Sequence, residues 1–339
     1  MPSEVLEAFQ EAAQAAVSLE HLQAAASRKI AELTGTESAL VTTGAAGALT
    51  LGTAAILTGH DLSQMERLPR CDGFPNEMII AREQRSGYDH AVRLAGARLV
   101  EVGFNEVVAN AGVRRTEVWE YEAAITQATA GIVYAYSNNS QPPLPDLVEM
   151  AHRHSLPVLV DAAGELPPRS NLKSIPATGA DLVAFSGGKA IRGPQSTGIL
   201  CGRHDLVSSA ALQLLDMDDH FELWEPPPEL IDRSQLSGHP RHGLGRSLKV
   251  SKEEIAALLV ALDLFVSGAY DKELPAQNSR LELIARELSD RPVECQILHA
   301  PDGEKWPRLQ IKLPHSNPHM AFEICRALRK GTPPIYLGH

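Results

Sequence analysis

Short runs of consecutive apolar residues alternate with amphipathic segments along most of this chain. Apolar residues that recur at three- and four-residue steps predict two opening helices, at residues 3–16 and 19–33. The apolar run that begins at Ala39 breaks into small residues near Gly44 and opens a helix to about Thr58. Strands are then expected at residues 78–81, 98–102, 131–136, 157–160, 182–185 and 198–201. Helices are expected between most of these strands, at residues 88–94, 118–128, 144–154 and 172–178.

The predicted strands are apolar runs, with charged residues only in the run at 98–102, and they do not alternate regularly between apolar and polar residues. This pattern is typical of strands that are buried on both faces, because helices cover both sides of a mostly parallel sheet. The chain therefore predicts an α/β fold with a mostly parallel central sheet.

The alternation of strands and helices stops between residues 222 and 248, where proline, glycine and serine clusters predict an irregular linker. A helix follows, with a capping-box pattern of Ser251 and Glu254 at its start and an expected end near Phe265. The chain continues as a helix, two strands and a last helix, at residues 278–288, 293–298, 309–313 and 319–329. We therefore expect an N-terminal helical segment, a large α/β domain, a linker and a small α+β domain, at residues 1–35, 36–222, 223–250 and 251–339.

Charge and composition exclude several classes of function. The 339 residues carry a formal net charge of −11, so the chain lacks the electropositive surface typical of a nucleic-acid binder. It contains no apolar stretch of about 18 residues that would predict a membrane span. The N-terminus lacks the pattern of a signal peptide, and the four cysteines have no CxxC spacing. We expect a cytoplasmic protein with reduced thiols and no metal site.

A carboxylate ends one of the apolar strands. Asp161 follows the strand at residues 157–160 and is itself followed by Ala162 and Ala163. Ligands bind beyond the carboxyl ends of the strands in open α/β sheets, so Asp161 is a candidate site residue. The structural alternative is a helix cap or a turn aspartate.

A lysine follows the next predicted strand, in the segment Ser-Gly-Gly-Lys at residues 186–189. One short helix separates this strand from the one that ends at Asp161, so both side chains can converge on one edge of the sheet. Desolvation favours the unprotonated amine of a lysine, and this is the form that makes a Schiff base. The alternative for Lys189 alone is a solvated turn.

Small residues and hydroxyls open the helix after the first apolar run, at residues 42–47 (Thr-Thr-Gly-Ala-Ala-Gly). Unpaired amides at a helix start bind anions, so Thr43, Gly44 and Ala45 are candidates for holding a phosphate. Ser186 can add a hydroxyl donor. Simple helix capping is the alternative. A phosphate-binding GxxxxGK[ST] loop is excluded because Val183 and Ala190 occupy two of its required positions, and no GxGxxG motif follows the first strand.

The amine, the carboxylate and the anion site are the three groups that a protein supplies to pyridoxal 5'-phosphate (PLP). The amine binds the aldehyde, the carboxylate binds the ring nitrogen and the anion site binds the phosphate. At these positions the chain resembles the selenocysteine synthase-like branch of fold-type I PLP enzymes, which includes L-seryl-tRNA(Sec) selenium transferase and D-glucosaminate-6-phosphate ammonia-lyase. The similar segments are residues 42–47, 82–85, 161–163, 185–189, 193–195 and 245–252. The resemblance implies a fold-type I large domain, with Lys189 as the Schiff-base lysine and Asp161 on the pyridine nitrogen.

The resemblance also implies a homodimer or larger homo-oligomer with active sites at the subunit interface. The segment around Arg246 would approach the neighbouring subunit's site, so Arg246 and Lys249 are candidates for binding an anionic substrate group; a basic surface patch is the alternative. Two departures from the family stand out. The tRNA-using members carry an extra N-terminal RNA-binding domain, and the family continues beyond residues 333–335 into a further strand and helix, so we expect a shortened C-terminal domain here.

Further candidates lie at other predicted strand ends. Asn138, or its neighbour Asn139, could bond the cofactor's ring hydroxyl or simply form a turn. Arg82, Gln84 and Arg85 follow the strand at residues 78–81, and one of them could lie over the ring. Ala163 is expected beside the cofactor. Arg308 begins a strand of the small domain and could clamp a substrate carboxylate.

The favoured function is a PLP-dependent lyase that eliminates the β-hydroxyl of a hydroxyamino acid or amino sugar acid and releases ammonia and a keto acid. Lys189 would take the α-proton. The residues do not distinguish this reaction from racemisation, aldol cleavage or transamination, because all of them proceed through a related carbanion or imine. Rival hypotheses are a tRNA-dependent selenium transferase, a non-catalytic scaffold and a nucleotide-binding α/β protein. No membrane or nucleic-acid partner is expected.

Overall fold

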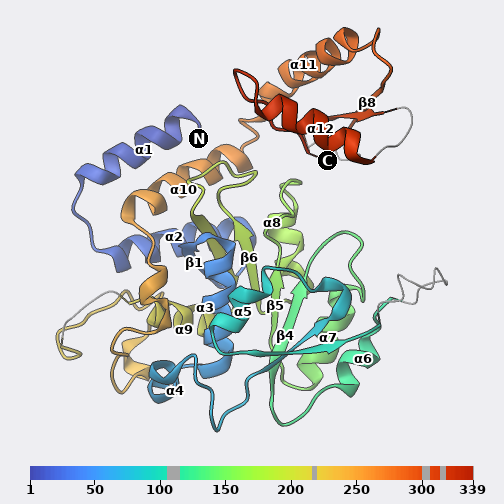
Figure 1. The fold of residues 1–339 in the computed structure, drawn as a ribbon. Helices are drawn as coiled ribbons and strands as arrows, with labels where there is room; N and C mark the ends of the chain where they lie inside the picture. Colours follow the sequence, from blue (N-terminus) through green and yellow to red (C-terminus); the bar gives the residue numbers. More distant parts are fainter. Residues whose placement is uncertain (105–114, 216–219, 300–305, 314–317, 339) are drawn as a thin grey trace. The chain divides into compact units, whose positions relative to one another are not determined.

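The computed structural model describes residues 1–104, 115–215, 220–299, 306–313 and 318–338 (Figure 1). The chain divides into two compact units, Met1–Ser267 and Gly268–His339. The first unit contains the central sheet and every residue of the site described below, whereas the second is a small α+β unit.

Seven strands form the central sheet, in the order β1-β7-β6-β5-β4-β2-β3. Strand β7 is antiparallel to both of its neighbours, β1 and β6, while the other pairs are parallel. The prediction of a mostly parallel sheet in an α/β fold is therefore confirmed. The strands are β1 (Ser38–Thr43), β2 (Glu77–Ala81), β3 (Arg98–Val102), β4 (Thr129–Ala135), β5 (Val158–Asp161), β6 (Leu182–Ser186) and β7 (Thr197–Gly202).

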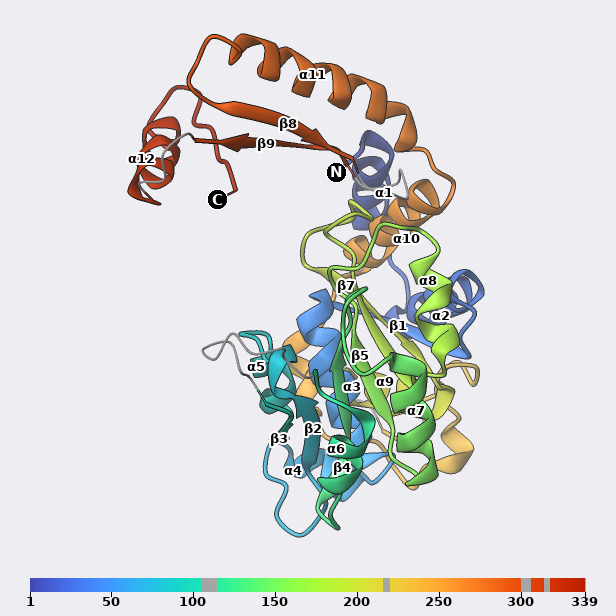
Figure 2. The same cartoon turned by 90° about the vertical axis from the view of Figure 1, so that its right-hand side faces the viewer.

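Helices cover both faces of this sheet. Figure 2 shows α2, α7 and α8 on one side and α3 and α5 on the other. The helices of the first unit are α1 (Ser3–Gln14), α2 (Leu19–Thr34), α3 (Gly44–Thr58), α4 (Leu62–Arg67), α5 (Asp89–Leu94), α6 (Val118–Ala123), α7 (Leu144–Arg153), α8 (Asn171–Ser174), α9 (His204–Gln213) and α10 (Lys252–Val266). This two-sided cover explains why the strands in the middle of the sheet are mostly apolar, whereas the edge strand β3 carries the charged residues Arg98 and Glu101.

Helix α3 is the central helix of the core and is buried along most of its length. A Cβ atom on Gly52 would lie 3.2 Å from the side chains of Leu159 and Leu200, so the glycine lets α3 lie close against β5 and β7. The tight packing fixes the N-terminus of α3 relative to the strand ends, and this matters for the site.

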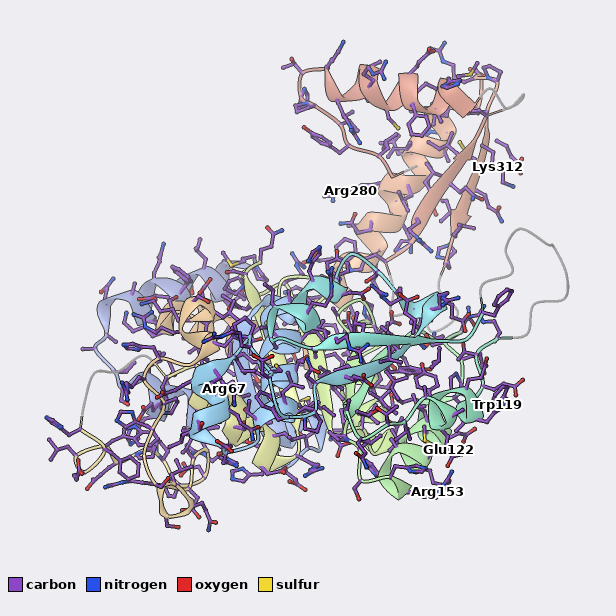
Figure 3. All side chains as sticks on the ribbon, turned by 60° about the horizontal axis from the view of Figure 1, so that its bottom comes forward. Arg67, Trp119, Glu122, Arg153, Arg280 and Lys312 are labelled. Atoms are coloured by element: carbon purple, nitrogen blue, oxygen red, sulfur yellow. The ribbon has the colours of Figure 1, made fainter. Side chains whose placement is uncertain are left out.

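Helices α6 and α7 are joined by polar contacts at their ends. Glu122 of α6 accepts a hydrogen bond from His154 Nε2 at 2.8 Å and lies 3.9 Å from Arg153 (Figure 3). His152 turns instead to the buried carboxylate of Asp181, at 3.0 Å. The two histidines therefore have separate partners. Within the described residues, no three His, Cys, Asp or Glu side chains gather where they could hold a metal ion.

Several elements differ from the sequence prediction. Helices α4 and α9 were not expected; α9 is buried along most of its length and lacks the polar face that makes a helix visible in a sequence. Helix α6 ends at Ala123, short of the predicted residue 128. The predicted capping box of Ser251 and Glu254 is present at the start of α10.

The boundary of the small unit also differs from the expected one at residue 250. Helix α10 packs against α1, α2 and β7 and so belongs to the first unit. The second unit consists of α11 (Leu274–Glu287), β8 (Glu294–Leu298), β9 (Arg308–Lys312) and α12 (Pro318–Arg329), with β8 and β9 antiparallel. No helix within the described ranges combines the length and the apolar character that crossing a membrane requires.

Strand β1 lies at the edge of the sheet, and side chains of α2 form hydrogen bonds with the backbone groups on its unpaired side. The buried Gln23 amide donates to Val41 O at 2.9 Å and accepts from Val41 N at 3.1 Å. Ser27 Oγ accepts from Ala39 N at 2.9 Å. These bonds replace those of a missing neighbouring strand, because buried backbone groups without partners are costly.

Replacement of Gln23 by leucine should destabilise the protein by about 2–4 kcal/mol, because it leaves two buried backbone groups of Val41 unpaired. The free energy of unfolding from urea titration measures the effect. Gln10→Leu, at an exposed position of α1, is the control and should change stability by less than about 0.5 kcal/mol. Equal effects for both variants would contradict this role of Gln23.

Candidate functional site

A cavity of about 580 Å³ opens at the carboxyl ends of strands β4, β5 and β6, beside the N-terminus of α3. This is the edge of the sheet at which ligands bind in open α/β folds. The residues that line it are Gly44, Ala45, Ala46, Leu49, Tyr88, Ala135, Tyr136, Asp161, Ala163, Gly164, Ser186, Gly188, Lys189 and Gln195.

Asp161 is the last residue of β5, and its carboxylate belongs to the cavity wall. Burial raises the pKa of Asp161 above its ordinary value; the N–H of Ala163, which donates to Oδ1 at 3.0 Å, and the positive charge of Lys189 oppose this shift. A buried carboxylate with a raised pKa gains from a cationic partner. A protonated ring nitrogen would be such a partner.

Lys189 lies in a loop that begins after β6 and is closed by backbone hydrogen bonds. Gly187 N donates to Thr197 O at 2.9 Å, and Gly193 N donates to Gly187 O at 2.9 Å. A Cβ atom on Gly188 would lie 2.5 Å from Gln195 Cα, so only glycine allows the two sides of the loop to pack. The Ser-Gly-Gly-Lys and Gly-Pro-Gln segments therefore form one packed unit that holds Lys189 at the cavity.

The N-terminus of α3 presents backbone amides to the cavity. Its N-cap residue, Thr43, makes no side-chain capping bond, because the Thr43 hydroxyl donates to Leu248 O instead. Gly44 has a φ of +67°, a conformation that favours glycine. Amides at the start of a 15-residue helix, with the helix dipole behind them, form a natural place for a phosphate.

Gly198 of β7 makes this arrangement possible. A Cβ atom at Gly198 would lie 2.2 Å from the Gly44 carbonyl carbon and 2.5 Å from Ala45 N. Gly198→Ala should therefore displace the start of α3 and weaken binding of a phosphate-bearing cofactor by about 10-fold or more. Titration of the cofactor-free protein with PLP measures the affinity. Gly338→Ala, in the second unit and with nothing within 4 Å of an added Cβ atom, is the control and should bind as the wild type does.

The structure brings together six of the predicted site residues. Lys189, Asp161, Gly44, Ala45, Ser186 and Ala163 all line the one cavity. They come from two strand ends and one helix start, as the positions of the apolar runs predicted. Their roles toward the cofactor remain predictions.

Three cofactor candidates lie elsewhere. Thr43 adjoins the cavity residues but its hydroxyl is used in the bond to Leu248. Gln84 is buried and its amide bonds to Gln141 O at 3.2 Å and to Ala135 N at 3.0 Å, so it ties strand ends together outside the cavity wall. Asn138 is exposed.

The three substrate candidates are also absent from the cavity wall. Arg246 is half-buried in the short 3₁₀ helix Leu244–Leu248, and Lys249 follows it, beside a separate small hollow under α2. Arg308 begins β9 in the second unit. Their proposed contacts with an anionic substrate remain predictions.

Two aromatic side chains in the cavity wall were not among the predicted site residues: Tyr88 and Tyr136. Tyr136 directly follows β4, and its N–H donates to Asp161 O at 2.9 Å. The position immediately after the strand was the signal that could have identified Tyr136 in place of Asn138. Tyr88 lies in the turn before α5 and carries no comparable signal.

The chemistry of the cavity fits PLP. It offers an amine, a carboxylate that gains from a cation and uncapped helix amides for a phosphate, all within one cavity. The glycines at 188 and 198 are required by close packing around the lysine and around the helix start. These groups are those that an aldehyde, a basic ring nitrogen and a phosphate ester need.

Comparison with known proteins also identifies a family of PLP-dependent enzymes. The sequence pattern of the class-V aminotransferase family matches residues 83–215. The 5'-C-glycyluridine monooxygenase-decarboxylase of a Streptomyces species is 31% identical over 98% of this chain and 76% of its own length.

Two further similarities concern lyases and transferases. The D-glucosaminate-6-phosphate ammonia lyase of Salmonella typhimurium is 28% identical over 78% of this chain, which spans 63% of that protein. The L-seryl-tRNA(Sec) selenium transferase of Desulfovibrio desulfuricans is 31% identical over 53% of this chain and 37% of its own length. The solved structure of a D-glucosaminate-6-phosphate ammonia-lyase superposes with a TM-score of 0.77 at 25% identity, over 99% of this chain and 82% of that one.

Proposed function

Because this chain belongs to the class-V aminotransferase family of fold-type I, PLP-dependent enzymes, we propose that it acts at the α-carbon of a β-hydroxy-α-amino acid and eliminates the hydroxyl group. The observation that carries this proposal is the convergence of Lys189, Asp161 and the start of α3 on one cavity.

The roles of the protein groups follow from their positions. PLP, when bound, withdraws electrons from the substrate's α-carbon. Asp161 keeps the ring nitrogen protonated, because its buried carboxylate gains from a neighbouring cation. The amides of Gly44 and Ala45 hold the phosphate. Lys189 would hold the aldehyde group of the cofactor, and its amine would take the α-proton of the substrate.

The net reaction conserves atoms. Loss of the α-proton and of the β-hydroxyl removes one water molecule, and hydrolysis of the resulting enamine, through its imine, adds one water molecule and releases ammonia. A substrate R–CHOH–CHNH₂–COO⁻ therefore yields R–CH₂–CO–COO⁻ and NH₃. No oxidant or reductant is needed.

The names of the relatives support this substrate class. Glucosaminate and serine are α-amino acid units with a hydroxyl on the neighbouring carbon, and a glycyl group on C5' of uridine places the 5'-hydroxyl in the same position. A β-hydroxy-α-amino acid is the feature that the three names share. The acidic net charge of −11 disfavours a tRNA-linked form of it.

A second candidate function is oxygen-dependent decarboxylation of such an amino acid. It is favoured by one observation, the similarity to the Streptomyces monooxygenase-decarboxylase over 98% of this chain. The two candidates begin with the same substrate and differ in the products, since decarboxylation consumes O₂ and releases CO₂.

A spectrum and a product assay test the proposal. The purified protein supplied with PLP should absorb in the visible region, and borohydride should bleach this band and fix the cofactor to Lys189. Incubation with D- and L-hydroxyamino acids should then release equal amounts of ammonia and keto acid. Release of CO₂ with uptake of O₂ would favour the second candidate, and a protein that stays colourless with PLP would overturn both. Sedimentation measurements test the proposed homo-oligomer.

A further inference from the structure

Tyr88 stands at the mouth of the cavity. Its side chain is 69% exposed and yet belongs to the cavity wall, so one part of it faces solvent and another faces the site. The residue lies between β2 and α5, away from the strands that carry Asp161 and Lys189. A large aromatic side chain at this place can contact a ligand that enters the cavity or the part of a bound ligand that extends out of it.

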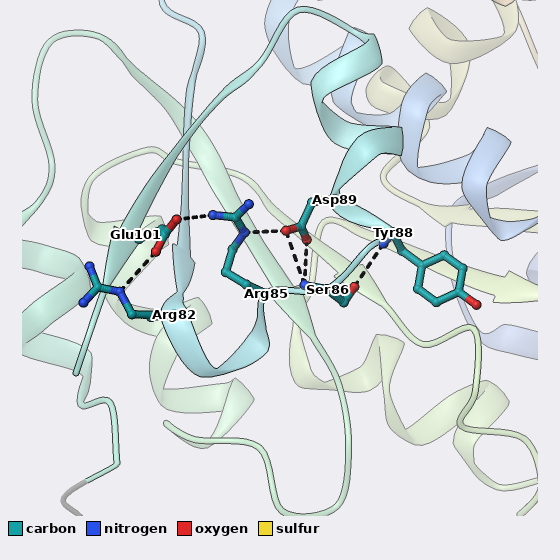
Figure 4. Close-up of polar contacts among 6 residues, drawn as sticks. All are labelled: Arg82, Arg85, Ser86, Tyr88, Asp89 and Glu101. Atoms are coloured by element: carbon teal, nitrogen blue, oxygen red, sulfur yellow. Dashed lines mark hydrogen bonds and ion pairs between the residues drawn. The ribbon is translucent and has the colours of Figure 1, made fainter. Parts of the chain in front are cut away.

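A chain of ion pairs and hydrogen bonds holds the backbone beside Tyr88 (Figure 4). Arg85 pairs with Asp89 on one side and with Glu101 of β3 on the other. The Asp89 carboxylate also accepts from Ser86 N at 3.3 Å, and Ser86 Oγ accepts from Tyr88 N at 3.2 Å. We call Arg85, Ser86, Asp89 and Glu101 the Arg85 brace.

The Arg85 brace is buried at one end and linked to further charges at the other. Asp89 is only 7% exposed, and Arg82 shares the carboxylate of Glu101 at 3.1 Å. Charge-assisted bonds in such a network are stronger than isolated surface pairs. Figure 4 shows the Tyr88 ring pointing away from these ion pairs.

We propose that Tyr88 is a specificity-determining residue that contacts the substrate beyond its β-carbon, and that the Arg85 brace positions it. This inference rests on the proposed function and names the class of side chain that the site selects. The ring offers an apolar face for C–H groups and the phenol offers a hydrogen bond. A polyhydroxylated, sugar-like chain presents both C–H faces and hydroxyls, so it fits this surface better than a short or purely apolar side chain does.

Two probes with the same amino acid core separate this role from a general one. D-Glucosaminate carries a polyhydroxylated chain beyond the β-carbon, and D-serine carries none. The dissociation constant of each probe is measured from the change in the visible spectrum of the PLP-loaded protein, so that turnover is not required. Tyr88→Ala should weaken binding of D-glucosaminate by about 10- to 100-fold and that of D-serine by less than about 3-fold. Tyr88→Phe should fall between the wild type and the alanine variant.

A second variant tests the positioning role. Arg85→Gln should weaken D-glucosaminate binding by about 3- to 10-fold and D-serine binding by less than about 2-fold, because Arg85 acts on the bound side chain through Tyr88. Arg85→Lys should recover part of the loss. The control variants are Trp119→Ala, which removes a 52% exposed aromatic ring outside the cavity wall, and Arg153→Gln, which removes an exposed ion pair on α7. Both should bind the two probes as the wild type does.

The outcomes separate this proposal from the proposed function. Equal losses for both probes in Tyr88→Ala, or no loss for either, would overturn the role of Tyr88. Binding of D-serine but not D-glucosaminate to the wild-type protein would overturn the sugar-like substrate class and leave the reaction intact. A protein without a visible band after addition of PLP would instead overturn the proposed function. In that case, calorimetric measurement of D-glucosaminate binding to the wild type and to Tyr88→Ala still decides whether Tyr88 recognises this molecule.

Discussion

Replacement of Lys189 by alanine should abolish covalent retention of the cofactor and lower kcat by about 10³-fold or more. One side chain holds the aldehyde of the cofactor and removes the α-proton of the substrate, and loss of a general base alone costs about 10²- to 10⁴-fold. Lys189 can take both roles because the packed loop of residues 187–195 holds it at the cavity that Asp161 also lines. Borohydride treatment followed by mass spectrometry of the intact protein, together with the keto-acid assay, measures both effects.

Lys173→Ala is the matched control. Lys173 is an exposed lysine on α8, outside the cavity wall, so its loss should leave the covalent cofactor and the turnover unchanged. A Lys189→Ala protein that still retains the cofactor after borohydride treatment would show that another lysine is the attachment site.

Replacement of Asp161 by asparagine should lower kcat by about 10²- to 10⁴-fold while cofactor can still bind. Asparagine keeps the shape of the side chain but does not stabilise a positive charge on the ring nitrogen, so the ring loses its capacity to accept electrons. Single-turnover rates with a hydroxyamino acid measure the effect. A variant with wild-type rates would be inconsistent with a bond between Asp161 and the ring nitrogen.

The same substitution should have the opposite effect on the stability of the cofactor-free protein. Burial raises the pKa of Asp161 in the folded state above the ordinary value of about 3.9, so folding becomes less favourable as the pH rises through the raised pKa. Asparagine carries no charge, so Asp161→Asn should be at least as stable as the wild type at pH 7. The difference should vanish below about pH 4, where the carboxyl is protonated in both states. Thermal unfolding at a series of pH values checks the sign.

The large domain could be predicted from the sequence because its strands are buried on both faces. Apolar runs gave the six expected strands, β2 to β7, but not the antiparallel direction of β7, and the strand ends gave Asp161 and the segment that carries Lys189. Helix α9 escaped prediction because it is buried along most of its length and has little periodicity. Helix α10 was assigned to the small domain because sequence order does not reveal which unit a helix packs against.

The site was predictable only where its residues lie directly at the end of a strand or the start of a helix. Lys189, Asp161 and the amides of Gly44 and Ala45 follow directly from the ends of elements. For side chains in the loops, the sequence gave the neighbourhood but not the residue: Asn138 was preferred to Tyr136, and Gln84 proved to bond to backbone groups of Ala135 and Gln141. Loop side chains depend on local hydrogen bonds that leave no periodic pattern.

The sequence by itself determined the layers of this protein, the edge of the sheet that carries chemistry, and the lysine and carboxylate that reach it, because burial and strand direction are written into the order of apolar residues. Only the tertiary structure decided that Gly198 lets the start of α3 approach the sheet and that the Arg85 brace places Tyr88 at the cavity mouth. The physical reason is that these features depend on contacts between residues far apart in the chain, at distances of a few ångströms, which only packing of the whole unit can set.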